Sequence, residues 1–304
     1  MSRNLTEEAT TDDLIQPFQI DGAAVRGHVL RLGPAAAEML GRHIYPEAVL
    51  RLLGEAVALT ALLTSTLKFE GIFTLQIQAD GPVTLMVVDC RSNGDLRAMA
   101  SYKAEAFGAP ADAIDDRSAA ELLGKGHLAF TVDQGPDTER YQGIVELDGP
   151  TLADCAQAYF RRSEQLATAI SLAAGRGADG TWRIGGIMVQ RLPGEGPLLE
   201  VVDEAVEAWQ RNMVLMKSVK PAELLDAALP PRDLLYRLFH EDGVWVHPTR
   251  ALRAKCRCSR ARVAGVLKSF PAEEVADLVE DGWINVTCEF CNETYKFEPG
   301  VYGS

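Results

Sequence analysis

Apolar and polar residues alternate through most of the first 190 positions, and one long apolar segment interrupts the alternation. Segment 47–67 has almost no polar face, so we expect a helix buried against a sheet. Short helices are predicted at 34–40, near Ala119 and at 151–163. Strands interleaved with few helices predict an α+β domain. The predicted strands are 15–20, with a turn at Asp21-Gly22, then 25–32, 71–79, 83–89, 96–102, 126–133, 141–147, 170–173 and 181–190.

A proline- and glycine-rich stretch, Pro193-Gly194-Glu195-Gly196-Pro197, ends this pattern and predicts a domain boundary. Helices are then predicted at 198–218, 221–228 and 233–239. These helices are too small to hold a core alone, so we expect them to lie on the strand-rich domain. The apolar stripe of the first helix serves either packing or binding, and comprises Leu198, Val202, Val206, Trp209, Met213 and Met216.

The predicted organisation therefore has four parts. A polar, mobile tail over residues 1–13 precedes the core domain 14–193, the helical linker 194–240 and a small C-terminal module 241–304. Within the module, beyond 244–247, we expect a helix from Ser259 to Lys268, a helix at 272–280, and strands at 283–287 and 293–297.

Four of the six cysteines form two pairs in this module, Cys256-Arg257-Cys258 and Cys288-Glu289-Phe290-Cys291. Four closely spaced thiols in a chain without a secretory signal predict a zinc site. Four thiolate ligands complete the tetrahedral coordination of a structural zinc ion. His240 and His247 could substitute but are not needed. Cys90 and Cys155 lie in or beside apolar segments and are expected to be buried.

Basic residues flank the first pair, and four thiolates on one Zn²⁺ leave about two negative charges to offset. Such cations favour the thiolate, which strengthens metal binding and also raises reactivity toward oxidants. The spacing alone therefore fits both a permanent structural zinc site and a redox sensor. The flanking cations are Arg253, Lys255, Arg257, Arg260 and Arg262.

Composition narrows the function classes. The chain has 304 residues, is 47% hydrophobic and carries a formal net charge of −13, which argues against nucleic-acid and anionic-membrane partners. The first residues are polar and no run of eighteen apolar residues occurs, so we expect a cytoplasmic protein with reduced thiols. His28, His43 and His127 are isolated, and nothing resembles a catalytic constellation, so no enzyme is predicted.

Several stretches, in order from about residue 14, resemble the redox-regulated heat-shock holdase family, also called the thirty-three-kilodalton chaperonin. The paired CxC and CxxC are the most specific of them. Departures are the acidic tail and Ala156-Gln157-Ala158, where the family usually has a Glu. The other stretches are Leu67-Lys68-Phe69-Glu70-Gly71, Tyr141-Gln142-Gly143-Ile144-Val145, Tyr159-Phe160-Arg161-Arg162-Ser163-Glu164-Gln165, Gly185-Gly186 through Gln190-Arg191-Leu192-Pro193, and Leu238-Phe239-His240-Glu241.

The resemblance implies an ATP-independent chaperone that is inactive while reduced and zinc-bound. It implies that Cys256, Cys258, Cys288 and Cys291 hold one Zn²⁺, and that peroxide with heat, or hypochlorous acid, converts them into disulfides Cys256–Cys258 and Cys288–Cys291 with loss of the metal. The module and linker then unfold and expose a surface that holds unfolded clients. The resemblance further implies a homodimer when active, and client handover to the seventy-kilodalton chaperone system.

Two other hypotheses remain from the residues. A zinc-ribbon nucleic-acid-binding protein would use the basic residues around Cys256, although the acidic chain disfavours it. A thiol-disulfide oxidoreductase would use the CxxC of Cys288 and Cys291, which normally begins a helix after a strand. Here the motif is predicted to lie between two strands.

Overall fold

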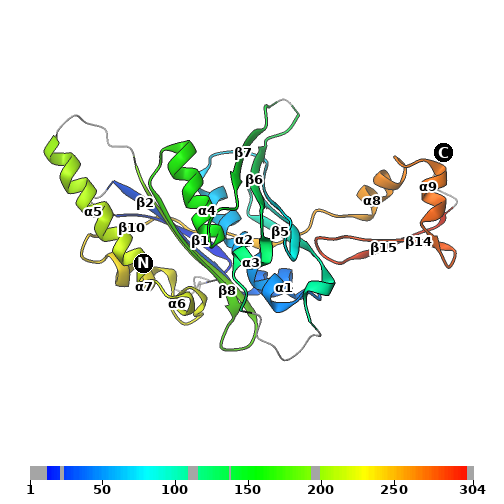
Figure 1. Cartoon of the computed structure of the whole chain (residues 1–304), viewed down its shortest axis with the longest axis horizontal. Coiled ribbons are helices and arrows are strands. Elements are labelled where there is room, and N and C mark those ends of the chain that lie inside the picture. Colours follow the sequence, from blue (N-terminus) through cyan, green and yellow to red (C-terminus); the bar gives the residue numbers. More distant parts are fainter. Residues whose placement is uncertain (1–11, 21–23, 109–115, 137, 193–198, 300–304) are drawn as a thin grey trace, which may run out of the picture. The chain divides into compact units, whose positions relative to one another are not determined.

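The computed structural model describes residues 12–20, 24–108, 116–136, 138–192 and 199–299. The chain divides into two compact units between Ala254 and Lys255 (Figure 1). The predicted α+β class is confirmed. The predicted mobile tail up to residue 11, the Asp21-Gly22 turn and the boundary at 193–197 lie outside the described residues.

The first unit contains two antiparallel sheets, one of them extended by a short parallel strand. The first sheet has the order β10-β1-β2-β9-β8, and β11 also pairs with β1. Its strands are β1 (Leu14–Ile20), β2 (Val25–Leu32), β8 (Thr168–Arg176), β9 (Trp182–Arg191), β10 (Val244–Val246) and β11 (Arg250–Ala251). The second sheet has the order β12-β5-β4-β3-β6-β7, in which β12 is the parallel strand. Its strands are β3 (Ile72–Ala79), β4 (Val83–Arg91), β5 (Asp95–Tyr102), β6 (Gly126–Asp133), β7 (Tyr141–Glu146) and β12 (Arg253–Ala254).

Helix α2 (Glu47–Thr66) lies in the core that the two sheets share, as its apolar sequence predicted. Side chains from both sheets, such as Ile184 and Val88, belong to the same buried cluster. By length and composition α2 could cross a membrane, but 83% of its most apolar window is buried inside the protein, which identifies it as a core helix. The other helices of this part are α1 (Pro34–Gly41), η1 (Ala104–Ala106), α3 (Ala119–Leu123), α4 (Leu152–Tyr159) and the π-helical turn η2 (Phe160–Glu164).

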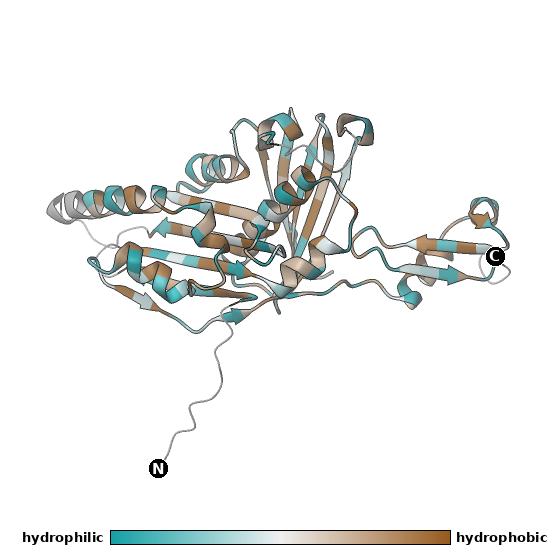
Figure 2. Cartoon of the chain, turned by 90° about the horizontal axis from the view of Figure 1, so that it is seen from below, coloured by the Kyte–Doolittle hydropathy of each residue, from teal (hydrophilic) through white to brown (hydrophobic). Residues whose placement is uncertain are grey.

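The linker helices cover the other face of the first sheet, which confirms the expected docking. They are α5 (Leu199–Lys217), α6 (Pro221–Leu225) and α7 (Pro231–Phe239), and α7 begins at a proline because the first turn needs no backbone N–H. Met216, Leu224 and Phe239 join Phe18 and Val189 of the sheet in a second buried cluster. Figure 2 shows hydrophobic and hydrophilic residues alternating along the strands, as expected when each face meets different surroundings.

A paired segment connects the linker to the second unit. β10 and β11 pair with β1, and β12 pairs with β5, so the segment 244–254, here called the strap, belongs to the first unit. The sequence placed the start of the module at residue 241. Short strands carry no signal of which sheet they will join, because their partners are more than a hundred residues away.

Asp12 and Asp13, assigned to the tail, are held in place. The Asp13 carboxylate accepts hydrogen bonds from the backbone N–H groups of Gly33 and Ala35 at 3.0 and 3.1 Å, which satisfies donors at the start of α1. Asp12 pairs with the buried Arg183. Both acids therefore contribute to the core domain.

The second unit is a three-stranded sheet with two helices. Its elements are α8 (Arg260–Leu267), α9 (Ala272–Asp277), β13 (Val279–Glu280), β14 (Trp283–Thr287) and β15 (Thr294–Phe297), in the sheet order β13-β14-β15. Ser259 caps α8 by accepting the N–H of Arg262. The buried core of this unit consists of four side chains among the described residues, Leu267, Val275, Ile284 and Phe297.

Candidate metal centre

The two cysteine pairs lie on local structures that expose their sulfurs. Cys256 and Cys258 lie on the extended segment before α8, and Cys288 and Cys291 flank the turn between β14 and β15. In that turn the N–H of Asn292 donates to the carbonyl of Cys288 at 2.8 Å. Asn292 adopts a left-handed conformation with φ of 57°, which asparagine tolerates better than most residues. The turn therefore directs both thiols to one side.

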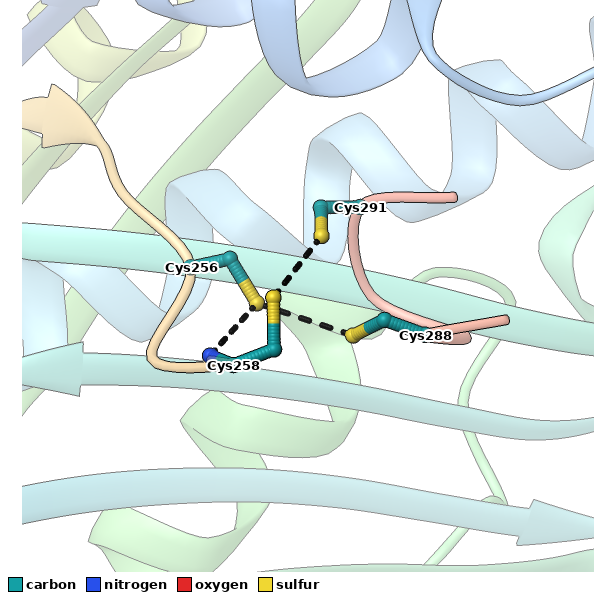
Figure 3. Close-up of side chains that lie close together, drawn as sticks. All are labelled: Cys256, Cys258, Cys288 and Cys291. Carbon is teal, nitrogen blue, oxygen red and sulfur yellow. Dashed lines mark hydrogen bonds between the residues drawn. The ribbon is translucent and has the colours of Figure 1, made fainter. Parts of the chain in front are cut away.

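All four sulfur atoms lie within 4.8 Å of one another (Figure 3). The Sγ atoms of Cys256 and Cys288 are 3.7 Å apart, and those of Cys258 and Cys291 are 3.3 Å apart. A tetrahedral site with Zn–S bonds of about 2.3 Å separates its sulfurs by about 3.8 Å. All six cysteines are free thiols. The donor set and its spacing thus fit a metal ion, and no other such group of His, Cys, Asp and Glu occurs among the described residues.

The cluster distributes protons unequally. Burial acts to raise the pKa of the Cys256 thiol, but hydrogen bonds from the Cys258 backbone N–H and the neighbouring thiols outweigh it and lower the pKa to about 7. Burial raises the pKa values of Cys288 and Cys291. The arrangement therefore stabilises the thiolate of Cys256, and a bound cation would offset the negative charge of a four-thiolate set.

Tyr295 contributes a contact that the sequence did not reveal. Its hydroxyl donates to the Sγ of Cys258 at 3.2 Å, and this hydrogen bond raises the pKa of the Tyr295 phenol. Tyr295 lies opposite Val286 in the β14–β15 hairpin. The hairpin register could have placed it beside the cysteine turn, but nothing in the sequence pointed its hydroxyl at Cys258.

Three of the flanking cations have partners other than the cysteine sulfurs. Arg253 pairs with Asp95 in the first unit, Arg260 lies over the Phe297 ring at 4.5 Å, and Arg262 donates to the carbonyl of Arg257 at 2.9 Å. An arginine side chain is long, and its planar guanidinium group can pair with a carboxylate, a ring or a carbonyl. These side chains can therefore reach such partners. The groups identified as lowering the pKa of Cys256 are the Cys258 backbone N–H and the neighbouring thiols.

The remaining candidate residues lie apart from the cluster. Cys90 and Cys155 are each 1% exposed, as predicted for small buried side chains. His240 Nδ1 lies 3.0 Å from the carbonyl oxygen of Tyr236, and His247 lies on the strap. His28 is buried, which lowers its pKa to about 4, and His43 stacks on Tyr45. His127 lies on β6, in the second sheet.

Comparison with known proteins agrees with this architecture. A family model described as Hsp33 protein matches residues 13–298. The 33 kDa chaperonin of Caulobacter vibrioides is 46% identical over 292 residues, 95% of each chain, and that of Sodalis glossinidius is 37% identical, covering 95% of this chain and 93% of the relative. The crystal structure of the Thermotoga maritima 33 kDa chaperonin, an Hsp33 homologue, matches with a TM-score of 0.80 and 25% identity over 95% of both chains. The chain therefore belongs to the Hsp33 family of chaperones.

Proposed function

We propose that this chaperone is a redox-regulated, ATP-independent holdase of the cytoplasm and not an enzyme. In the reduced form Cys256, Cys258, Cys288 and Cys291 hold one Zn²⁺ and the protein is inactive. The observation that supports this most strongly is the convergence of four thiols from two distant segments within 4.8 Å. A thiolate shell is also the part of such a site that oxidants attack.

Oxidation forms the disulfides Cys256–Cys258 and Cys288–Cys291. Each pair of zinc-bound thiolates gives up two electrons to one peroxide molecule, which takes two protons from the solvent and becomes two waters, and the Zn²⁺ is released. The sulfurs then have no thiolate to offer a metal. The two disulfides close loops of only about three or four residues, whereas a shared ion joins both ends of the second unit.

The second unit depends on the shared metal ion because its apolar core is small. A core of four buried side chains is far below what a domain of this size needs without a metal or disulfide framework. Structural zinc contributes on the order of 10–16 kcal/mol in small modules. Loss of the ion is therefore expected to unfold the unit.

Unfolding then spreads along the strap to the linker. Cys256 follows β12 with only Lys255 between them, and the strap leads back to α7. The functional division that we propose is a core at 14–193, a linker at 194–240 and a switch at 241–304, in which the strap moves with the switch. Release of the linker uncovers an apolar face of the first sheet that includes Phe18, Val29 and Ile187.

That uncovered face binds unfolded or partly folded clients, and prevents their aggregation. In this proposal the active form is a homodimer, and clients pass to the seventy-kilodalton chaperone system when the protein is reduced. These two steps rest on the family resemblance.

The deciding experiment measures zinc release and suppression of client aggregation together, before and after peroxide at elevated temperature. We expect both to rise in parallel in the parent protein. Cys256→Ser should lose zinc and suppress aggregation without oxidant, whereas the matched variant Cys90→Ser should behave as the parent. A Cys256→Ser protein that retains its zinc and stays inactive would refute the ligand assignment.

The alternative hypotheses gain less support. The CxxC of Cys288 and Cys291 lies in a turn between two strands instead of beginning a helix, which disfavours a thioredoxin-like oxidoreductase. An insulin-reduction assay tests this, and salt-sensitive binding of RNA or DNA would favour the zinc-ribbon hypothesis.

A further inference from the structure

A row of polar side chains crosses a sheet face on which most other buried positions, apart from His28, are apolar. Arg26 lies opposite Gln19 on β1 and opposite Gln190 on β9, and Gln190 lies opposite Thr168 on β8. Side chains two residues apart on a strand share a face, so Arg26 points to the same side as Leu30, which belongs to the core between the sheets. Polar residues at inward positions break the binary pattern, and such breaks concentrate at functional sites.

Among the residues that the structure describes, none supplies an anionic partner to the guanidinium of Arg26. Its Nε atom is buried and has no hydrogen-bond partner in the described part of the chain, and Nη2 reaches the Oε1 of Gln190 only at 3.5 Å. Within the described ranges no ion pair involves Arg26. Gln190 is 2% exposed. A charged donor held against buried polar groups without an acceptor is costly, which points to an acceptor supplied by a ligand.

Arg26 and Gln190 line a cavity of about 470 Å³, within the usual range for small-molecule sites. The aromatic side chains that line it come from the α2–β3 connection, the second sheet and the α4–η2 segment. Phe73 stacks on Phe130 with ring centroids 5.9 Å apart, and Tyr159 meets Phe130 edge-on at 4.7 Å. The aromatic residues are Phe69, Phe73, Phe130, Tyr141, Tyr159 and Phe160.

Among the described residues, Glu164 is the one acid that lines this cavity, and it is already engaged. Oε1 of Glu164 accepts the hydroxyl groups of Tyr141 at 2.8 Å and Tyr159 at 2.6 Å. The exposed Lys68 adds a second cation to the lining. The cavity therefore combines an apolar body, a partly buried cation and a hydrogen-bonding amide. Four of the stretches that resemble the family contribute residues to this cavity. The proposed redox switch of the four cysteines uses none of these residues.

We propose that this cavity binds an amphipathic monocarboxylate, a fatty-acid-like molecule with one carboxylate and an apolar chain. The carboxylate binds the guanidinium fork of Arg26, which matches it in charge and geometry, and Gln190 positions that fork. The apolar chain lies against the Phe73 and Phe130 rings. This site is independent of the cysteine cluster and of the redox proposal.

Calorimetric titration of the reduced, zinc-loaded full chain with submicellar decanoate tests the proposal, with decanol as the uncharged counterpart. We expect saturable binding of decanoate at about one site per chain, at least about tenfold tighter than decanol. Arg26→Met should remove that preference and leave decanol binding unchanged. The matched control Arg140→Met changes an exposed arginine that pairs with Asp133 and does not line the cavity, and it should bind as the parent.

Equal affinity of the parent for decanoate and decanol, or an undiminished decanoate preference in Arg26→Met, would overturn the proposal. Should Arg26→Met fail to fold, Arg26→Lys and the comparison of the two ligands on the parent decide the question. Arg26→Lys keeps the charge without the fork, so we expect an intermediate preference for decanoate. The absence of any saturable decanoate binding to the parent would also refute the site.

Discussion

A Cβ atom on Gly185 would lie 2.3 Å from the carbonyl oxygen of Leu224, so α6 rests on β9 at a separation that only glycine permits. The obstructing atom is backbone and cannot rotate away. The contact between linker and core is therefore set by the backbone itself, and any side chain at position 185 must push the linker outward.

Gly185→Val is accordingly expected to release the linker while the cysteine cluster stays intact. The variant should suppress client aggregation without oxidant and still contain one zinc per chain. Light scattering of an unfolding client, together with zinc analysis, measures both. In the control Gly175→Ala the new Cβ would lie 3.2 Å from the flexible Leu225 Cδ1, so the linker should stay docked. An inactive Gly185→Val protein would show that linker release does not expose the client-binding surface.

Arg31 on β2 holds helix α6 from the core side. It is 1% exposed and donates to the carbonyl oxygens of Asp226 and Glu223, at the C-terminal end of α6. Arg31→Met removes charge-assisted hydrogen bonds that are each worth about 1.5–3 kcal/mol. We expect faster amide hydrogen exchange in α6 and α7 and activation at a lower temperature. Unchanged exchange in these helices would contradict a clamping role, and Arg237→Met, at an exposed ion pair with Glu223, is the control.

Tyr295→Phe tests the hydrogen bond to the Cys258 sulfur. Neighbours that orient metal ligands commonly change metal affinity by about 10–100-fold, so the variant should lose zinc to a chelator at least about tenfold faster than the parent. Its peroxide-driven activation should be faster as well. Tyr102→Phe, at a partly buried position that packs against the core of the first unit, serves as the control. Equal zinc-release rates for Tyr295→Phe and the parent would show that the hydroxyl does not support the site.

Glu55 on α2 gives the core a dependence on pH. Burial raises the pKa of its carboxyl to about 7, and Arg51 only partly opposes this. The carboxyl of an unfolded glutamate has a pKa of about 4.3, so between about pH 4.3 and pH 7 the folded state holds a proton that the unfolded state has released. The stability that this proton contributes is fully present below about pH 4 and is lost as pH rises through 7.

Glu55→Gln should therefore match the parent in unfolding free energy near pH 4 and exceed it by about 3 kcal/mol at pH 8. Urea unfolding followed by tryptophan fluorescence measures the difference, because Trp182 is buried in the same cluster as α2. Glu105→Gln, at an exposed position, should shift neither value. A Glu55→Gln variant without added stability at pH 8 would show that the carboxyl ionises freely in the folded protein.

Local chemistry in the sequence was enough for several features. The apolar run of α2 predicted a buried helix, the proline at 34 marked the start of α1, and the strands interleaved with few helices predicted an α+β core. The two cysteine pairs predicted a metal-binding cluster because thiols in such spacing have few other uses in a reducing compartment. Each of these signals lies within a short window of residues.

The tertiary structure decided what depends on partners far apart in the chain. Only the fold shows that strap strands join sheets begun at residues 14 and 72, that Arg253 pairs with Asp95 instead of serving the cysteines, and that Arg26 reaches a cavity lined by aromatic side chains. Sequence periodicity predicts which face of a helix or strand a side chain occupies. It does not predict against which other part of the protein that face packs. Long-range pairing is fixed by the packing of the whole core, and no local pattern encodes it.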